Sequence, residues 1–368
     1  MFYLMIDNKS FFASVEAVER NLDPLKVRLI VMNTHKNTGS GLVVSASPMA
    51  KKVYHLVNVE HGMQVPHYKS LLQVPPRHWL YEEYSHQINQ LYRQKINPKD
   101  VYPYSIDESL LRINQPFSQA SQIAKGFRDD VYQHFGLYTT VGIGQNPVQA
   151  KLALDLLSKK ATNMQGTITD DNATDILWSI TNLTDIWSIG RQTAKKLKKL
   201  DINSIGDLAH FDQQHLHQVF KSRAKQLHAL AWGQDVGNHW FEETASQQKS
   251  VSASKIFSMD VANQKGLEKR FNAIIQSLVK RLDHRQGKVI GIYFRYSNGE
   301  FISHMKTLPN YIGTFSEIQM IALEMLNQYR QSGQPIRQLG ISLSNFKENQ
   351  HYENLKLFWY HQFWYFLT

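Results

Sequence analysis

Cysteine is absent from the whole chain of 368 residues. A chain without thiols can form no disulfide, use no thiolate nucleophile and bind no zinc through sulfur. Long apolar runs are absent as well. No stretch reaches the ~18 apolar residues that a membrane helix requires, and the first residues lack the basic lead of a secretory signal. These absences predict a cytoplasmic protein without a membrane-spanning segment.

Acidic residues are scarce relative to basic ones. The chain has 41 lysines and arginines against 31 aspartates and glutamates, which gives a net charge of +10. The surplus is largest between residues 246 and 346, where 13 basic residues stand against six acidic ones. This balance says nothing about the fold, but it favours a polyanionic partner, either nucleic acid or an anionic membrane surface.

Hydrophobic periodicity predicts a multidomain protein of mixed α/β (α+β) class. Near the N-terminus, the apolar run 2–6 and the segment 137–144 have the pattern of buried strands, while 78–96 and 147–161 have helical spacing. Ser10 is expected to cap a helix that follows the first strand. The order of these elements indicates an open sheet that carries helices on one face. Short helices follow, then a polar connector, then strands that enclose two helices.

Three acidic side chains interrupt these apolar patterns. Asp7 ends the first strand, and Asp107 and Glu108 stand side by side between two strand-like runs, about a hundred positions later. A set of oxygen ligands without histidine or cysteine suits Mg²⁺ or Mn²⁺. Taken alone, however, Asp7 could be a turn residue, and the pair could be a solvated hairpin tip.

Four ordered motifs carry a resemblance that decides between these alternatives. They are MIDNKSFFASVEAV (5–18), YSIDESLL (104–111), TTVGIGQNPVQAKLALD (139–155) and WSIGRQTAKKL (187–197). In this order and spacing they resemble the Y-family translesion DNA polymerases, in particular the UmuC/DinB-like bacterial branch. The resemblance implies a template-directed, error-prone polymerase of the lesion-bypass type, acting in DNA repair and SOS-like damage tolerance.

The fold that the resemblance implies is a right hand. Its expected parts are a palm at 1–24 and 77–165, fingers at 25–76, a helical thumb at 166–234, a linker at 235–248, a little finger at 249–346 and a tail at 347–368. The implied partners are primer-template DNA and a deoxynucleoside triphosphate, with a regulatory subunit as a further candidate. No membrane partner is expected.

The resemblance assigns the acidic residues to metal binding. Asp7, Asp107 and Glu108 match the family's ligands for two Mg²⁺ ions, for which Mn²⁺ can substitute, and the main-chain carbonyl of Asn8 is a plausible further ligand. The implied chemistry is phosphoryl transfer by positioning and charge neutralisation.

Other matches concern the nucleotide. Phe12 matches the aromatic steric gate that excludes a ribose 2′-hydroxyl, although a plain core role is the alternative. Ser45 and Lys51 match residues that contact the triphosphate, whereas Pro48 stands where many relatives have tyrosine.

The family also places a lysine one turn after the match to Asp155. In some relatives this lysine lies three positions later, which here is Ser158. We therefore expect Lys159 to bind the β- or γ-phosphate, with Lys160 as the rival.

The segment WSIGRQTAKKLKKL resembles a helix-hairpin-helix, which binds a DNA phosphate through main-chain N–H groups. Gly190 is expected to permit its tight turn, and Arg191, Lys195 and Lys196 to add positive charge without reading sequence. A plain structural hairpin is the alternative.

The tail segment ENLKLF (353–358) resembles the peptide by which bacterial polymerases dock on the sliding clamp. Leu355, Leu357 and Phe358 are the expected anchors. A random apolar tail is the alternative.

Two other classes of function share parts of this pattern. A nucleotidyl cyclase or nuclease could use the same carboxylates without a primer and template. A catalytically silent DNA-binding or clamp-associated protein would bind DNA without incorporating nucleotides.

Overall fold

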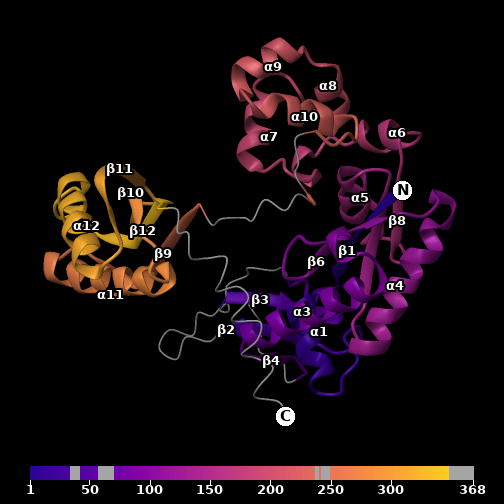
Figure 1. The fold of residues 1–368 in the computed structure, drawn as a ribbon, viewed down its shortest axis with the longest axis horizontal. Helices are drawn as coiled ribbons and strands as arrows, with labels where there is room; N and C mark the ends of the chain where they lie inside the picture. The colour runs from indigo at the N-terminus through magenta and orange to yellow at the C-terminus, as the bar shows by residue number, and fades with distance from the viewer. Residues whose placement is uncertain (34–41, 57–69, 237–239, 242–248, 348–368) are drawn as a thin grey trace. The chain divides into compact units, whose positions relative to one another are not determined.

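The computed structural model describes residues 1–33, 42–56, 70–236, 240–241 and 249–347 (Figure 1). The chain divides into two compact units, Met1–Glu242 and Glu243–Thr368. Within the described residues no helix is both long and apolar enough to cross a membrane.

A five-stranded sheet forms the centre of the first unit. Its order is β5-β6-β1-β7-β8, with β1 in the middle, antiparallel to both of its neighbours. The strands are β1 (Phe2–Asn8), β5 (Val101–Pro103), β6 (Glu108–Ile113), β7 (Thr139–Gly144) and β8 (Gln165–Ile168). The chain therefore leaves and re-enters the sheet several times, which brings segments that are distant in the sequence to one end of the sheet.

Both faces of this sheet are covered. Leu4 and Ile6 of β1 pack with α3 (His78–Lys95) and α4 (Ala120–Phe135), while Met5 packs on the opposite face with α5 (Pro147–Ala153). The expectation of helices on one face only is therefore wrong. The physical reason lies in β1, where the successive side chains of residues 2–6 point to opposite faces and are apolar, so both faces need covering.

The helix expected at 147–161 is shorter and changes its geometry. α5 ends at Ala153, and a π-helical turn, η4 (Leu154–Ser158), follows it. The buried Ser158 hydroxyl donates to the carbonyl oxygens of Val141 (2.7 Å) and Ala153 (3.0 Å). A side chain that bonds to β7 in this way holds the widened turn against the sheet.

A smaller, three-stranded sheet flanks α1 (Phe11–Val18). Its strands, in the order β3-β2-β4, are β2 (Leu29–Asn33), β3 (Leu42–Ala46) and β4 (Leu72–Val74), and α2 (Pro48–Tyr54) follows β3. Ser10 precedes α1 in a left-handed conformation and its side chain makes no capping hydrogen bond. The expected Ser10 cap is wrong because a capping side chain needs an extended backbone.

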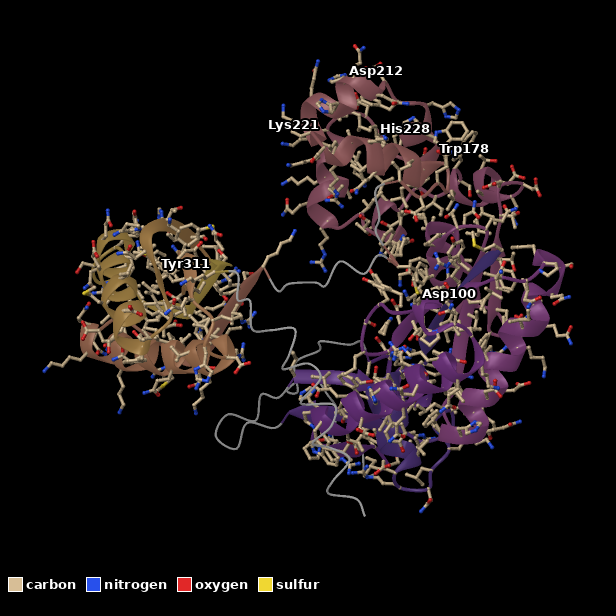
Figure 2. All side chains as sticks on the ribbon, in the orientation of Figure 1. Asp100, Trp178, Asp212, Lys221, His228 and Tyr311 are labelled. Carbon is tan, nitrogen blue, oxygen red and sulfur yellow. The ribbon has the colours of Figure 1, made fainter. Side chains whose placement is uncertain are left out.

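Five α-helices follow β8 among the described residues of the first unit. They are α6 (Ala173–Leu177), α7 (Arg191–Lys198), α8 (Ile205–His210), α9 (Gln213–Phe220) and α10 (Arg223–Ala231). They share an apolar core that includes Leu197, Leu208 and Leu227. Trp178 (labelled in Figure 2) ties α10 to the start of this bundle by donating its indole N–H to the carbonyl oxygen of Ala231 (3.1 Å).

The second unit is a separate antiparallel sheet with two helices. Its strand order is β11-β10-β12-β9, and α11 and α12 pack with it around one apolar core, as expected. The elements are β9 (Ser250–Val261), α11 (Gln264–Leu282), β10 (Gly287–Tyr296), β11 (Phe301–Ile312), α12 (Phe315–Tyr329) and β12 (Ile336–Phe346).

Part of the segment read as a linker packs in the first unit. The buried Trp240 packs at ring-centroid distances of 5.7 to 6.0 Å against Trp187 and the tyrosines Tyr102 and Tyr104. Its indole N–H donates to Asp235 (2.8 Å).

The contact between α5 and β7 leaves no room for a side chain at Gly142. A Cβ there would lie 2.0 Å from the carbonyl oxygen of Ala150 and 2.3 Å from the nitrogen of Leu154, both backbone atoms that cannot yield. We expect Gly142→Ala to lower the free energy of unfolding by about 3 kcal/mol, measured by urea denaturation.

Gly126 of α4 provides the matched control, because nothing lies within 4 Å of its added Cβ. Gly126→Ala should raise the free energy of unfolding by about 0.5 to 1 kcal/mol, since alanine is the better helix former. Equal effects of the two substitutions would contradict the packing argument.

Candidate active site

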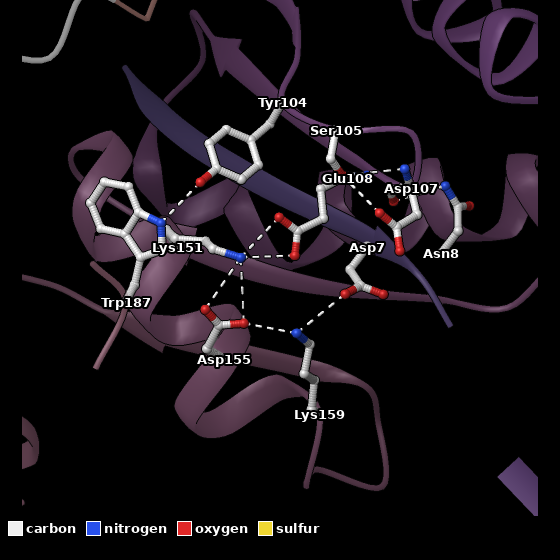
Figure 3. A network of polar contacts seen from close by, with 10 residues as sticks. All are labelled: Asp7, Asn8, Tyr104, Ser105, Asp107, Glu108, Lys151, Asp155, Lys159 and Trp187. Atoms are coloured by element: carbon white, nitrogen blue, oxygen red, sulfur yellow. Dashed lines mark hydrogen bonds and ion pairs between the residues drawn. The ribbon is translucent and has the colours of Figure 1, made fainter. Parts of the chain in front are cut away.

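The pairing of β1 with β6 brings the three distant acids together (Figure 3). In this register Asp7 is opposite Glu108, the first residue of β6. Asp107 lies in the turn just before β6, and its main-chain oxygen accepts hydrogen bonds from the backbone N–H (2.9 Å) and side-chain amide (3.1 Å) of Asn8. The acids are therefore held at one end of the sheet by backbone pairing.

A cavity of about 580 Å³ opens at this end of the sheet. The seven residues that the sequence assigned to catalysis or nucleotide binding all line it: Asp7, Phe12, Ser45, Lys51, Asp107, Glu108 and Lys159. They come from the sheet and the turn before β6, from α1, β3 and α2, and from the residue after η4, so only the tertiary fold can bring them together. Pro48 lies on the same wall, and Lys160 is not among the lining residues.

Charges of alternating sign connect two of the acids. Glu108 accepts from the buried Lys151 (2.8 and 2.9 Å), and Lys151 also pairs with Asp155 (3.2 Å). Asp155 in turn accepts from Lys159 (2.8 Å), which pairs with Asp7 (3.2 Å). Glu108, Lys151, Asp155, Lys159 and Asp7 thus form one row of ion pairs, which Figure 3 shows. Glu108, Lys159 and Asp7 of this row line the cavity.

The lysines of this row compensate the charge of the partly buried acids Asp7 and Glu108 only in part. Burial raises the pKa of Asp7, with a smaller contribution from the like charge of Asp107, while Lys159 acts in the opposite direction. Burial likewise raises the pKa of Glu108 against the effect of Lys151. For Lys159, burial would lower the pKa, but the nearby acids Asp7 and Asp155 outweigh it and raise it. The acids therefore lie where additional positive charge would be stabilised.

The π-helical turn decides which lysine enters the cavity. The N–H of Lys159 lies 3.4 Å from the carbonyl oxygen of Leu154, five residues earlier. Position 158, the other place considered for this lysine, holds Ser158, which is buried and bonded to β7. One extra residue in the turn thereby gives Lys159 the place beside Asp155.

The residues fit a divalent cation by the chemistry of their oxygen atoms. Asp7, Asp107 and Glu108 share one cavity, and carboxylate oxygens are the ligands that Mg²⁺ prefers. Within the described residues no three acidic or histidine side chains already converge as a ligand set. Glu108 pairs with Lys151, and Asp107 accepts from the Ser105 hydroxyl (2.7 Å). Asp7, Asp107 and Glu108 would hold the ion after these side chains turn.

Sequence reasoning missed Lys151, and it treated Asp155 only as a landmark for the lysine. The signal was present, because lysine, aspartate and lysine recur at positions 151, 155 and 159 on a segment with helical spacing. Residues four apart lie on one face of a helix, so this pattern predicts one row of paired charges. Ser105 was also missed, and no local pattern marks it.

Phe12 of α1 and Ser45 of β3 both line the cavity. The Phe12 ring stacks on Tyr81 of α3, with ring centroids 4.2 Å apart and planes 14° apart. The Ser45 hydroxyl accepts from the backbone N–H of Ala13 (3.3 Å). Lys51 of α2 lines the same cavity. Burial lowers the pKa of Lys51, although the charge of Asp7 acts in the opposite direction.

The expected phosphate-binding hairpin lies in the helical bundle. Arg191 and Lys195 are exposed on α7, which Gly190 precedes. Gly190 has a φ of −83°, which any residue can adopt, so the turn does not depend on a glycine. The expectation that Gly190 permits the tight turn is therefore wrong. The left-handed residue is Ser188 (φ 72°), whose backbone and side-chain oxygens accept from Arg223.

The tail residues Leu355, Leu357 and Phe358, expected to bind a sliding clamp, lie outside the described residues.

The buried position of Lys151 makes its ion pairs measurable. Lys151→Met would leave Glu108 and Asp155 without their shared cation, so we expect the free energy of unfolding to fall by about 3 kcal/mol. Urea denaturation at pH 7 with EDTA present tests this. Lys125→Met, which breaks the exposed pair with Asp129 (2.6 Å) on α4, should cost under about 1 kcal/mol. Equal losses would show that burial of the row does not matter.

Two family models match the chain. The impB/mucB/samB family model matches residues 6–155, and the model of that family's C-terminal domain matches residues 248–357. Together they span more than half of the sequence, and the first begins one residue before Asp7.

Curated relatives match over nearly the full length. The chain is 29% identical to UvrX of Bacillus subtilis (strain 168), a protein named for UV-damage repair, over 96% of this chain and 85% of the relative. It is 26% identical to the DNA polymerase IV of Clostridioides difficile (strain 630), over 96% of each.

Solved structures share the fold. A Y-family DNA polymerase chimera of Dbh and Dpo4 matches with a TM-score of 0.77 at 21% identity, over 95% of this chain and 100% of the other. DinB from Sulfolobus solfataricus matches with a TM-score of 0.54 at the same identity and coverage. With both family models, the full-length relatives and the shared fold, the chain belongs to the impB/mucB/samB family, the Y-family of DNA polymerases of the DinB/UvrX-like bacterial branch.

Proposed function

We propose that this protein is a template-directed DNA polymerase of the lesion-bypass type, which joins a deoxynucleoside triphosphate to the 3′-hydroxyl of a primer. The observation that carries the proposal is one cavity that is lined by three acids, by three lysines and by the ring of Phe12, all brought together from separate elements. Membership of the Y-family, whose characterised role is translesion synthesis in DNA repair, supports the reaction class.

Asp7, Asp107 and Glu108 are the residues that would hold the magnesium ions of this reaction. When bound there, Mg²⁺ would lower the pKa of the primer hydroxyl and neutralise charge on the triphosphate. The carboxylates fix where that positive charge lies, and Asn8 fixes Asp107 through its main chain.

The cations on the cavity wall would bind the triphosphate. Lys159 and Lys51 present ammonium groups, and Ser45 a hydroxyl, to the same space as the acids. Pro48 provides no side-chain donor, so one phosphate contact found in relatives with tyrosine is lost or replaced. Phe12 would lie beneath the sugar, where its ring leaves no room for a 2′-hydroxyl.

The DNA would be held by charge rather than by base contacts. Arg191 begins α7 and Lys195 lies in its last turn, and both are exposed. The space at Gly190 is open, so a phosphate could approach its backbone N–H. The basic second unit, read as a little finger, would add further phosphate contacts. The tail residues are proposed to bind a sliding clamp.

Removal of a metal-binding carboxylate tests the chemistry directly. Asp107→Ala or Glu108→Ala should slow primer extension by roughly a thousandfold, at least ~4 kcal/mol of transition-state stabilisation, in assays with Mg²⁺ and each dNTP separately. Asp129→Ala is the matched control, because this acid lies on the exposed face of α4.

Near wild-type extension by either active-site variant would refute the assignment. Turnover without a primer and template would instead indicate a cyclase or nuclease. Tight DNA binding without any incorporation by the wild-type protein would indicate a silent DNA-binding protein.

The proposed gate makes a second prediction. Phe12→Ala should raise the efficiency of ribonucleotide incorporation, relative to the matching deoxyribonucleotide, by about a hundredfold, because the space under the sugar is no longer filled. Single-nucleotide insertion kinetics with CTP and dCTP measure the ratio. A variant that rejects ribonucleotides as well as the wild type does would refute the gate.

A further inference from the structure

A fully buried carboxylate outside the cavity stands out in the first unit. Glu16 of α1 has no exposed surface, yet its side chain accepts hydrogen bonds from three donors. The Arg77 guanidinium donates to both of its oxygens (3.0 and 2.8 Å), the Tyr81 hydroxyl donates to one (2.8 Å), and Arg20 donates to the other. Burial would raise the pKa of Glu16, but these donors together lower it, so the carboxylate is charged.

Tyr81 is held as firmly as Glu16. Its ring is fully buried. Its hydroxyl donates to Glu16 and accepts from the backbone N–H of Arg77 (3.1 Å). The ring of His78 meets both Tyr81 and Phe12 edge-on, at 5.9 Å and 83° in each case. A tyrosine fixed at its hydroxyl end and along its edge presents one flat face in one orientation.

Phe12 rests on that face. The two rings lie 4.2 Å apart and nearly parallel, while Phe12 also lines the cavity. Phe12 and Glu16 are four residues apart on α1, so they lie on the same side of the helix. Tyr81 therefore contacts Phe12 with its ring and Glu16 with its hydroxyl.

A network of this kind contributes little net stability. Replacing a buried ion pair by apolar residues is often neutral, whereas a satisfied polar network fixes geometry. The hydrogen bonds and ion pairs of Glu16 run to Arg20, Arg77 and Tyr81 and not to the row of ion pairs at the cavity. The contact that joins this network to the cavity is the stacking of Tyr81 on Phe12.

We propose that Glu16 and Tyr81 are positioning residues for sugar selection, which hold the Phe12 ring at a fixed height beneath the bound nucleotide. The inference rests on the proposed function, because it takes Phe12 as the gate. It adds that exclusion of ribose depends on a support beneath the gate as well as on the gate ring itself. Loosening the support should let Phe12 move away from a 2′-hydroxyl while leaving deoxyribonucleotide insertion nearly unchanged.

The chain contains a matched control for this support. The Tyr84 hydroxyl donates to Glu19 (2.8 Å), which is the same kind of bond between the same two helices, three residues further along each. The Tyr84 ring packs near Phe135 and not against Phe12. Tyr81→Phe and Tyr84→Phe each remove one hydroxyl, and only the first loosens the ring beneath the gate.

The experiment compares these two variants with Glu16→Gln and Phe12→Ala in the full chain, by single-nucleotide insertion of CTP and dCTP on one primer-template. We expect Tyr81→Phe and Glu16→Gln to lower discrimination against CTP by roughly fivefold to tenfold, with kcat and KM for dCTP within about twofold of wild type. Tyr84→Phe should leave discrimination unchanged. Urea denaturation of each variant separates a loss of fold from a loss of selectivity.

The possible outcomes separate a failure of the proposed support from a failure of the proposed polymerase function. If Phe12→Ala loses discrimination while Tyr81→Phe and Glu16→Gln keep it, the gate stands and the support is refuted. Equal losses for CTP and dCTP in those two variants would indicate a merely structural role and also refute it. If the wild-type protein inserts no nucleotide, the proposed function fails and the inference falls with it.

Discussion

The antiparallel pairing of β1 with β6 is the interaction on which the site depends. It sets Asp7 opposite Glu108, and the bonds from Asn8 to the main chain of Asp107 extend the same register into the turn. A slip of one residue would turn Asp7 to the other face of the sheet. Such a slip is unfavourable because it would bury the charge of Asp7 without burying any further apolar surface of β1. The strand that gives stability thus also fixes the chemistry.

The acids at that sheet end are stable in the folded chain because lysines accompany them. Lys151 and Lys159 share Asp155 between them, so each partly buried carboxylate in the row has a cation within 3.2 Å. Under the proposed function, a metal ion would replace the lysines as the positive partner of the acids. A triphosphate would replace the acids as the negative partner of the lysines. The site therefore needs no new burial of unpaired charge when it is loaded, which keeps the cost of occupancy low.

Much of the fold follows from the sequence, and the misses have local causes. The apolar runs give the buried strands, and the spacing of 78–96 gives α3 almost to the residue. Ser10 and Gly190 were read from residue preference, but backbone conformation decided both positions, and the left-handed residue of the second turn is Ser188. The π-helical turn leaves no signature in hydrophobic spacing, because its widening is fixed by a hydrogen bond from Ser158 to a neighbouring strand.

The site shows the same division between what sequence patterns carry and what only packing decides. The motifs supplied seven of the residues that line the cavity, since a reactive side chain is marked by its type and its neighbours. They did not supply Lys151, Tyr81 or Glu16, which act on the cavity through another residue. Glu16 in particular looks like an ordinary solvated helix position in the sequence, and only the convergence of Arg20, Arg77 and Tyr81 makes it a buried anchor. Residues that orient a functional group are recognised by what surrounds them, so the structure is needed to find them.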